Sequence, residues 1–422
     1  MRRSMELREL HLADLHQRAR ALGIPSFRML TRDQLIEAIQ EQGGAEPAEQ
    51  PGREGAEERE PTGDRAEPGS EAPGREEPVG EEVTGVLDRM PQGYGFLRLG
   101  GTHEGAGDVY VSASQIRRCE LRPGDEVTGP ARDPRRGERH RALVRVTAVN
   151  GQSPEDDRSH FEDLTPAPPT RRLLAPDAEA DPLVRAVDLL GPLAYGQRVL
   201  ILAQPRSGRT TLLRALGAAV ADDAHLCVLL ADERPEEVPQ WERALPGAEI
   251  FAAPADQEPR DQVREAELAM GHAKRLAEGG TDVVVLIDSL SRLALGYRDP
   301  ARVKRMFGSG RELAEEGSGS LTVVATVLDS DDRGAEVREA LETTENLLLR
   351  LDAGLAARGI VPAFDAAASR ISGEEELREP DELERARRLR VELGEMDAET
   401  AARNLSDQIA ATSSNAELLA RL

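Results

Sequence analysis

The first stretch that could carry out chemistry is a loop of small residues between an apolar run and a helix-forming run. Residues 203–211 read Ala-Gln-Pro-Arg-Ser-Gly-Arg-Thr-Thr and follow the apolar run 199–203. A loop that leads from a strand into a helix offers backbone N–H groups and the positive end of the helix dipole to an anion. The phosphate-loop pattern G-x-x-x-x-G-K-S/T is matched with two departures, Ala203 for the first glycine and Arg209 for the lysine. The spacing predicts a phosphate-binding loop.

Acidic residues follow two of the apolar runs that the sequence predicts as strands. Asp288 ends the run 283–287, and Asp232 and Glu233 follow the run 226–230. The carboxyl ends of parallel strands meet at the edge of the sheet where α/β proteins bind ligands. Asp288 is then placed to hold a magnesium ion beside a bound nucleotide. The alternative is that acids end these two strands by coincidence.

A second group of candidate binding residues is aromatic. Tyr94, Phe96 and Tyr110 fall within 17 residues, in a chain with only six Phe, four Tyr and one Trp. Strand alternation places Tyr94 and Phe96 on one face, where rings flanked by glycines offer flat surfaces to unstacked bases. The alternative is that the three rings form the core of a small barrel.

Two different folds are needed to position these groups. Five short runs of β-type residues within 83–150, separated by turn residues, predict a small barrel of the oligonucleotide-binding (OB) type. From residue 181 onward, apolar runs alternate with helical segments, which indicates a parallel sheet covered on both faces. Helical spacing of apolar residues within 5–40 predicts a small N-terminal helical module.

Composition excludes several classes of protein. The chain has 422 residues, 78 of them acidic and 54 basic, which leaves a net charge of −24. It has no apolar leader and no run of about 18 apolar residues, so we expect a soluble, cytoplasmic protein. The cysteines, Cys119 and Cys227, lack C-x-x-C spacing, which argues against a disulfide scaffold or a cysteine-ligated zinc site. The net charge by itself argues against nucleic-acid binding.

The negative charge is unevenly distributed. Residues 41–82 contain 14 acidic side chains and four arginines, a local net charge of −10, and are rich in Pro and Gly. Such a segment buries too little apolar surface to offset the entropy of ordering, so we expect a disordered linker. It is either an inert spacer or a tail that competes with RNA for a basic groove. Seven arginines are expected near the aromatic residues: Arg98, Arg117, Arg118, Arg135, Arg136, Arg139 and Arg141.

Taken together, these motifs resemble the bacterial transcription termination factor Rho family. The strings that carry the resemblance are 93–98, 108–112, 114–118, 232–238, 288–294 and Met396 after 394–395. The resemblance runs from about residue 5 to 422, except for the acidic linker. It implies a hexameric RNA-dependent ATPase that moves along RNA from 5′ to 3′. The predicted fold is multidomain: 1–40 N-terminal helical module, 41–82 acidic disordered linker, 83–150 OB-type, cold-shock-like β-barrel, 151–180 connector, and 181–422 RecA-like α/β P-loop ATPase domain.

The resemblance also implies site residues. A single-stranded, pyrimidine-rich RNA would be held by Gly93, Tyr94, Gly95, Phe96, Leu97, Arg98, Asp108, Val109, Tyr110, Glu138, Arg139 and His140, where His140 replaces the usual aromatic residue but can still stack. ATP would be bound by Tyr195, Gly196, Gln197, Arg198, Arg206, Ser207, Gly208, Arg209, Thr210, Thr211 and Arg234. Mg²⁺ would be held by Thr210 and Asp288. Glu233 would be the catalytic carboxylate that activates the attacking water.

The chain departs from the family pattern in three places. Arg209 replaces the P-loop lysine, and a planar guanidinium is a poor substitute for a compact ammonium, so hydrolysis should slow while binding survives. A channel loop expected after Tyr297 is missing, whereas the other channel loop, with Arg333 as an RNA-contacting residue, is retained. Arg370 could serve as the catalytic arginine acting across subunits only with a local register shift.

The leading interpretation is a Rho-type termination factor that binds nascent single-stranded RNA and uses ATP and Mg²⁺ to translocate and release transcripts. Its expected partners are RNA, further copies in a homohexamer or a mixed ring with another Rho, and the RNA polymerase elongation complex, with no membrane. One alternative is a catalytically weakened paralogue that acts as an RNA-binding or regulatory ring subunit. Another is an unrelated nucleotide binder such as a rotary ATPase subunit, which leaves the aromatic residues unexplained.

Overall fold

The computed structural model describes residues 80–99, 105, 107–155, 157–174 and 180–422. The predicted helical module at 1–40 and nearly all of the predicted acidic linker lie outside the described residues. Strand β1 (Glu81–Arg89) begins two residues before the first predicted strand, at the end of the range assigned to the linker.

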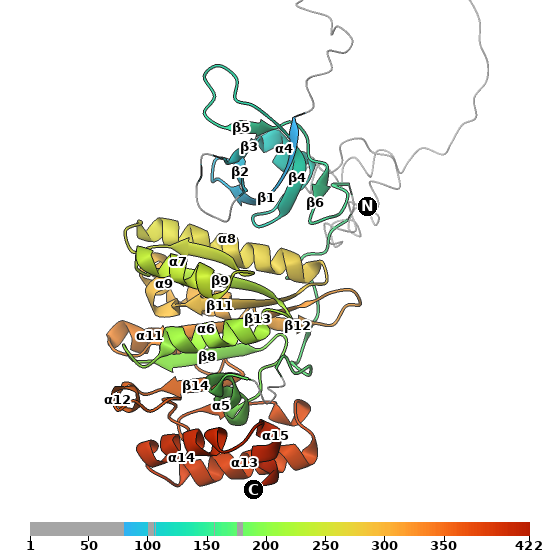
Figure 1. The fold of residues 1–422 in the computed structure, drawn as a ribbon. Helices are drawn as coiled ribbons and strands as arrows, with labels where there is room; N and C mark the ends of the chain where they lie inside the picture. Colours follow the sequence, from blue (N-terminus) through green and yellow to red (C-terminus); the bar gives the residue numbers. More distant parts are fainter. Residues whose placement is uncertain (1–79, 100–104, 106, 156, 175–179) are drawn as a thin grey trace, which may run out of the picture. The chain divides into compact units, whose positions relative to one another are not determined.

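Residues 81–149 form the small closed barrel that the sequence predicts (Figure 1). Its further elements are β2 (Gly95–Arg98), β3 (Val109–Val111), α4 (Ala113–Arg118), β4 (Glu126–Arg132), β5 (Arg141–Leu143) and β6 (Ala148–Val149). The strand order is β1-β2-β3-β5-β4-β6, and an additional pairing between β1 and β4 closes the sheet. The barrel interior is built from aliphatic side chains such as Leu87, Leu97 and Val127. The aromatic residues are therefore not needed to fill the barrel core.

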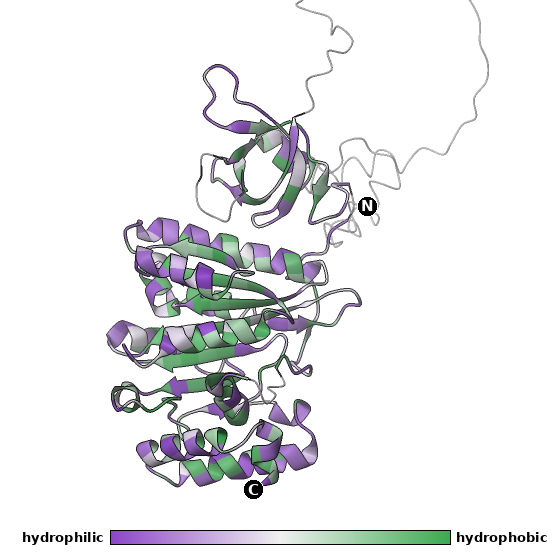
Figure 2. Ribbon diagram, viewed as in Figure 1, coloured by the Kyte–Doolittle hydropathy of each residue, from purple (hydrophilic) through white to green (hydrophobic). Residues whose placement is uncertain are grey.

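The second domain is an α/β structure around a mainly parallel sheet, as predicted. The strands are β7 (Pro166–Ala167), β8 (Arg198–Ala203), β9 (His225–Ala231), β10 (Glu249–Ala253), β11 (Asp282–Asp288), β12 (Arg311–Leu313), β13 (Ser320–Leu328), β14 (Leu347–Leu351) and β15 (Arg370–Ile371). The main path runs β10-β9-β11-β13-β8-β14-β15, and its pairs from β10 to β14 are parallel. In Figure 2 the central strands of this sheet are coloured mainly as hydrophobic.

Helices cover both faces of this sheet, which explains why the strands are apolar throughout. They are α5 (Pro182–Leu190), α6 (Arg209–Val220), α7 (Val238–Ala244), α8 (Pro259–Glu278), α9 (Leu290–Tyr297), α10 (Pro300–Phe307), α11 (Asp332–Leu341), α12 (Ala353–Ala357), α13 (Pro380–Gly394), α14 (Ala398–Ala410) and α15 (Asn415–Ala420). One core contains residues of α5, α6, α13 and α14, and the other contains residues of α8, α9, α10 and α11. None of the helices in the described ranges is both long enough and apolar enough to span a membrane.

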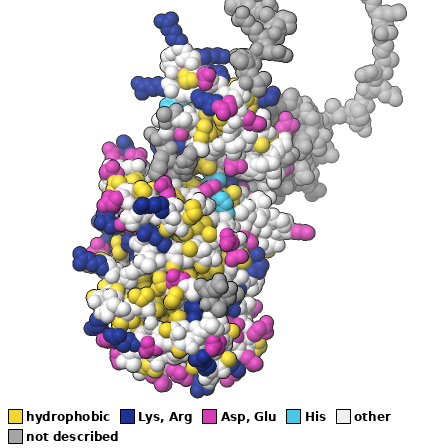
Figure 3. All heavy atoms as spheres, in the orientation of Figure 1, with side chains coloured by type: hydrophobic (Ala, Val, Ile, Leu, Met, Phe, Trp, Pro, Cys, Tyr) yellow, Lys and Arg dark blue, Asp and Glu magenta, His cyan; other side chains and the backbone are white. Residues whose placement is uncertain are grey.

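The strand register brings the predicted catalytic loops to one edge of the sheet. Asp288 at the end of β11 is level with Leu230 near the end of β9. On β8, Ala203 is level with Leu328 at the end of β13. The loops that follow β8, β9 and β11 therefore all leave the sheet at its carboxyl edge. On the face shown in Figure 3, acidic and basic side chains are interspersed, so the net charge does not make this face uniformly negative.

Candidate nucleotide and RNA sites

The loop between β8 and α6 has the form that an anion-binding loop requires. It crosses from Ala203 to Arg209 with Arg206 at φ +65° and Gly208 at φ +90°. Gly208 is the residue before α6, and no side chain caps the first turn of this helix in the described part of the chain. The first N–H groups of a helix have no partner within the helix, so those of α6 are available to a phosphate. Ser207 is buried, and its hydroxyl makes no hydrogen bond to any described residue.

The two predicted carboxylates, Glu233 and Asp288, lie beside this loop and are both buried. Asp288 accepts hydrogen bonds from the hydroxyls of Thr326 (3.1 Å) and Thr210 (3.4 Å). Arg209 pairs with both acids at once, through Nη2 to Glu233 Oε1 and Nε to Asp288 Oδ1, each at 2.9 Å. The guanidinium thus bridges the carboxylates that a magnesium ion and an attacking water would use.

A second arginine in this centre, Arg292 on α9, has no role in the sequence-based prediction. Its Nη1 lies 2.5 Å from Glu233 Oε1 and donates to the carbonyl of Asp232 at 2.7 Å. Arg292 belongs to the string 288–294 that supported the family resemblance, so its presence was visible in the sequence. Its position was not, because α9 must fold back on the loop after β9 to bring the two residues together.

The surroundings of Glu233 shift its affinity for a proton. Burial raises the pKa of the carboxyl, and the negative charge of Asp288 raises it further, whereas Arg292 and Arg209 oppose both effects. The resulting pKa lies above the ordinary value of 4.5. Glu233 is therefore a stronger proton acceptor than an exposed glutamate, the property that a residue activating water needs.

An aromatic cluster of Tyr94, Phe96, Tyr110 and His140 forms the second candidate site, on the barrel. Phe96 and Tyr110 pair across β2 and β3 with ring centroids 6.0 Å apart. Tyr94 lies 5.6 Å from Tyr110, and His140 lies 5.0 Å from Phe96. All four rings remain partly accessible, and Tyr110 is 37% exposed. The cluster is therefore a surface feature and offers ring faces and edges to flat ligands.

A groove of about 580 Å³ adjoins the aromatic cluster. Besides Phe96, Tyr110 and His140, its lining includes Gln115, Arg118, Arg132 and Arg139. Arg132 holds Glu138 in a hydrogen-bonded ion pair at 2.7 Å, which lowers the pKa of this carboxyl to about 2. Glu138 therefore stays ionised but is already partnered. Gln115 and Arg132 were not among the predicted RNA-binding residues, although Gln115 lies in the string 114–118.

Both domains match known family models. The model of the Rho termination factor RNA-binding domain matches residues 83–155, and that of the ATP synthase alpha/beta family nucleotide-binding domain matches residues 184–309. The transcription termination factor Rho of Chromobacterium violaceum is 41% identical over 78% of this chain and 85% of its own length. The chain belongs to the transcription termination factor Rho family. This finding does not favour the two alternative interpretations.

Relatives with the same name differ in how much of their length this chain spans. The Rho of Streptomyces lividans is 40% identical over 81% of this chain, but the match covers only 51% of the relative. The Rho of Mycobacterium leprae is 36% identical over 92% of this chain and 69% of its own length. The chain thus spans between half and about two thirds of these longer members of the family.

Several residues that the family pattern assigns to the nucleotide are not at the P-loop. Residues 195–197 precede β8 and Arg198 begins it, so all four lie at the amino edge of the sheet, about 20 Å from the loop at the other end of this six-residue strand. Gln197 donates to the carbonyl of Pro192, and Arg198 donates to those of Thr344 and Gly310. Their polar groups are thus used to hold the fold, and within one chain they do not join the phosphate-binding loop.

The predicted arginines outside the P-loop also lie apart from the carboxylates. Arg234 is exposed and pairs with Glu237 at 2.6 Å, so it turns away from neighbouring Glu233. Arg370 is on edge strand β15 and pairs with Glu345 at 2.6 Å. Arg333 is an exposed residue in the first turn of α11. A single chain does not bring these arginines to its own nucleotide site.

The side chains of four members of the predicted RNA site, Leu97, Arg98, Asp108 and Val109, are buried in the barrel. Leu97 and Val109 are 0% exposed and belong to its core. Arg98 donates to Asp88 through Nε at 3.2 Å and forms an ion pair with Asp108, and all three side chains are buried. Strand alternation explains the inward position of Leu97 and Val109, because their neighbours Phe96 and Tyr110 face outward. Arg98 is buried for a different reason, its pairing with the two acids. These residues support the aromatic cluster from below and do not reach a ligand in this conformation.

The connection between α9 and α10 is too short to hold a channel loop. Helix α9 ends at Tyr297, and α10 begins at Pro300, with Arg298 in the left-handed region as the C-cap and Asp299 as the N-cap. The Asp299 carboxylate accepts from the N–H of Ala301 at 2.9 Å. Both linking residues are thus committed to capping, which is consistent with the shortening inferred from the sequence.

Proposed function

We propose that this chain is a transcription termination factor that captures nascent single-stranded RNA on the barrel and uses ATP hydrolysis to translocate and release transcripts. The observation that carries the proposal is the combination, in one Rho-family chain, of an accessible aromatic cluster and an uncapped P-loop flanked by two buried carboxylates. Stacking on partly exposed rings suits unpaired bases and requires no fixed sequence. The proposed site of action is the elongation complex of RNA polymerase in the cytoplasm.

The residues at the carboxyl edge fit a nucleotide with Mg²⁺. We assign the β- and γ-phosphates to the backbone N–H groups of 206–211 and Mg²⁺ to the oxygens of Thr210 and Asp288, the hard ligands that this ion prefers. When bound, Mg²⁺ would neutralise charge on the phosphates. Glu233 accepts a proton from the attacking water, and Arg292 keeps its carboxylate oriented. Arg209 must leave its bridging position for the ion to be bound.

We further propose a ring of identical subunits, or a mixed ring with another Rho. Arg370 is 59% exposed at the side chain and sits on an edge strand, a position that supports its assignment to a neighbouring chain's nucleotide. An arginine supplied in this way stabilises charge in the transition state of phosphoryl transfer. Arg333 on α11 is the proposed channel contact to RNA, by resemblance.

We infer that Arg209 slows hydrolysis, because its bidentate pairing with Glu233 and Asp288 competes with the metal ion and withdraws the side chain from the phosphates. Arg209→Lys should raise the kcat of RNA-stimulated ATP hydrolysis roughly tenfold. A compact ammonium cannot bridge both acids, so the lysine side chain is free to reach the phosphates. Steady-state phosphate release measures this effect. Arg243→Lys, an exposed site on α7, is the matched control. An unchanged or lower kcat would count against the inhibitory bridge.

The central experiment measures RNA-stimulated ATPase activity and oligomer mass in one buffer. With Mg²⁺, ATP and a pyrimidine-rich RNA, we expect hydrolysis that depends on RNA and a mass of several subunits. The proposal fails if hydrolysis does not exceed that of a Glu233→Ala control.

The pH dependence of hydrolysis should reflect the raised pKa of Glu233. Glu233 acts as a proton acceptor only when ionised, so kcat should fall as the pH drops through a value above the carboxyl's ordinary 4.5. A kcat profile at saturating ATP and RNA, from about pH 5 to about pH 8, tests this expectation. A kcat that stays flat to the lower end contradicts it.

A further inference from the structure

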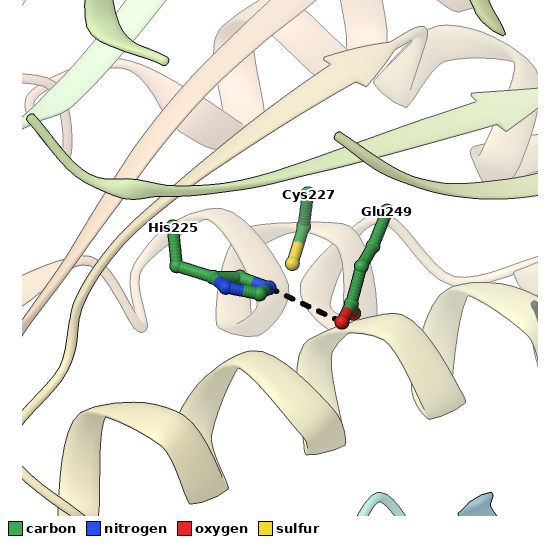
Figure 4. Close-up of side chains that lie close together, drawn as sticks. All are labelled: His225, Cys227 and Glu249. Carbon is green, nitrogen blue, oxygen red and sulfur yellow. Dashed lines mark ion pairs between the residues drawn. The ribbon is translucent and has the colours of Figure 1, made fainter. Parts of the chain in front are cut away.

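A cluster of nitrogen, sulfur and oxygen side chains lies at the edge of the sheet opposite the nucleotide site. His225 and Cys227 are two residues apart on β9, so they share one face. Glu249 begins the parallel edge strand β10 and is directly level with Cys227. Figure 4 shows the His225 ring and the Glu249 carboxylate turned toward each other, with the Cys227 sulfur directed to the space between them.

The donor atoms of these three residues are close enough to share one ion. One ligand atom from each residue lies within 4.8 Å of the others, and His225 Nε2 is 3.3 Å from Glu249 Oε1. In a tetrahedral zinc site, metal–ligand bonds of about 2.0–2.3 Å place ligand atoms roughly 3.3–3.8 Å apart. The observed separations approach this spacing, and the remaining difference requires shifts of about 1 Å or less per side chain.

A second histidine fixes the carboxylate from the helix above. His272 on α8 is 1% exposed, and its Nε2 lies 3.0 Å from Glu249 Oε2, the oxygen that does not face His225. Its Nδ1 lies 2.9 Å from the carbonyl of Gly124. Neither His225 Nε2 nor His272 Nε2 makes a well-aligned hydrogen bond to a described residue, although both atoms are shielded from solvent. Two imidazole nitrogens thus converge on one carboxylate at ion-pair distance, and neither contact has the alignment of a good hydrogen bond.

We propose that His225, Cys227 and Glu249 bind a Zn²⁺ ion, with His272 positioning Glu249. The donor set of imidazole, thiolate and carboxylate is one that zinc takes up and that Mg²⁺ and Ca²⁺ do not. Thiolate and carboxylate together balance the two charges of the ion. A ligating carboxylate held by an outer partner, as Glu249 is by His272, is the usual arrangement around bound metal.

The site is separate from the nucleotide chemistry. It lies at the start of β9, whereas Glu233 follows the end of this seven-residue strand, about 20 Å away. A metal there would tie edge strand β10 to β9 beneath α8. The side chains of His225 and Glu249 are 31% and 40% exposed, which gives an ion access from solvent. A search for C-x-x-C spacing does not find this cluster, because it has one cysteine and its three ligands come from two different strands.

The test uses the full-length chain, freed of any affinity tag, incubated with zinc chloride and then desalted. We expect one zinc per chain by elemental analysis, and for the cobalt-loaded protein an absorption band from thiolate-to-metal charge transfer. Cys227→Ser should abolish this band, and His225→Ala should weaken zinc affinity at least tenfold. Cys119→Ser, the other buried cysteine, should behave as wild type.

Two results would overturn the proposal. The first is wild-type protein that retains no zinc, which would mean that Glu249 is only an ion-pair partner of the two histidines. The second is a cobalt spectrum that Cys227→Ser leaves unchanged, which would place the metal elsewhere. Melting temperatures and RNA affinity of the metal-free variants show that each is folded. His225→Ala changes a partly exposed side chain and keeps the test decisive if Cys227→Ser fails to fold.

Discussion

Glu233→Gln should lower the kcat of RNA-stimulated ATP hydrolysis by on the order of 10²- to 10⁴-fold, the range expected for loss of a general base. Glutamine keeps the shape of the side chain, but its amide cannot accept a proton from water. Glu233 is 8% exposed and lies next to Asp288, Arg209 and Arg292, so no bulk water can replace its function. Phosphate release under saturating ATP and RNA measures the loss.

Controls separate catalysis from folding and binding. Glu236→Gln changes an exposed acid three residues away and should leave kcat unchanged. Nucleotide affinity, measured with a non-hydrolysable ATP analogue, should change little in Glu233→Gln, because the backbone of the P-loop holds the phosphates. If Glu233→Gln retains more than about a tenth of the wild-type kcat, Glu233 is not the general base.

Phe96→Ala should weaken binding of a single-stranded pyrimidine oligonucleotide by about 5- to 150-fold, the loss expected from about 1–3 kcal/mol per stacked base. Phe96 contacts Tyr94, Tyr110 and His140, so it is the residue that joins the aromatic cluster. Its removal takes away one ring and the support of its neighbours. Fluorescence anisotropy with a labelled oligonucleotide measures the dissociation constant.

The stacking origin of this loss can be separated from charge effects. Phe96→Tyr retains a ring and should keep affinity close to wild type. Arg139→Ala removes an exposed charge from the groove, so it should reduce the dependence of affinity on salt by about one phosphate contact, whereas Phe96→Ala should not. Equal affinity in Phe96→Ala and wild type, with an unchanged melting temperature, would remove the aromatic cluster from RNA binding.

Local sequence patterns were sufficient for the parts of both sites that lie within one strand or one turn. The apolar run before residue 203 and the helix-forming run after Arg209 predicted a strand, a loop and a helix, and the loop lies between β8 and α6. Alternation along 94–96 placed Tyr94 and Phe96 on one face, where the structure has both rings partly accessible, whereas Leu97, predicted as an RNA contact, is in the barrel core. Such predictions succeed because strand period, helix period and loop composition depend on neighbouring residues.

Local sequence patterns could not predict contacts between segments that are far apart in the sequence. Arg98 and Asp108 are predicted RNA contacts, but in the structure they form a buried ion pair because β2 and the segment before β3 meet in the closed barrel. Residues 195–198 were assigned to the nucleotide, yet strand direction places them at the opposite edge of the sheet. A match to a family's sequence motif identifies residues but does not determine the direction in which each side chain points.

The sequence by itself determined that this chain combines an OB-type barrel with a parallel α/β nucleotide-binding domain, because hydrophobic period and turn spacing are local properties. It also identified Glu233 and Asp288 as acids at strand ends. Only the tertiary structure decided that Arg209 bridges these two acids, that Arg292 joins them, and that His225, Cys227 and Glu249 converge. Those contacts depend on sheet order and register, which pair residues far apart in the sequence.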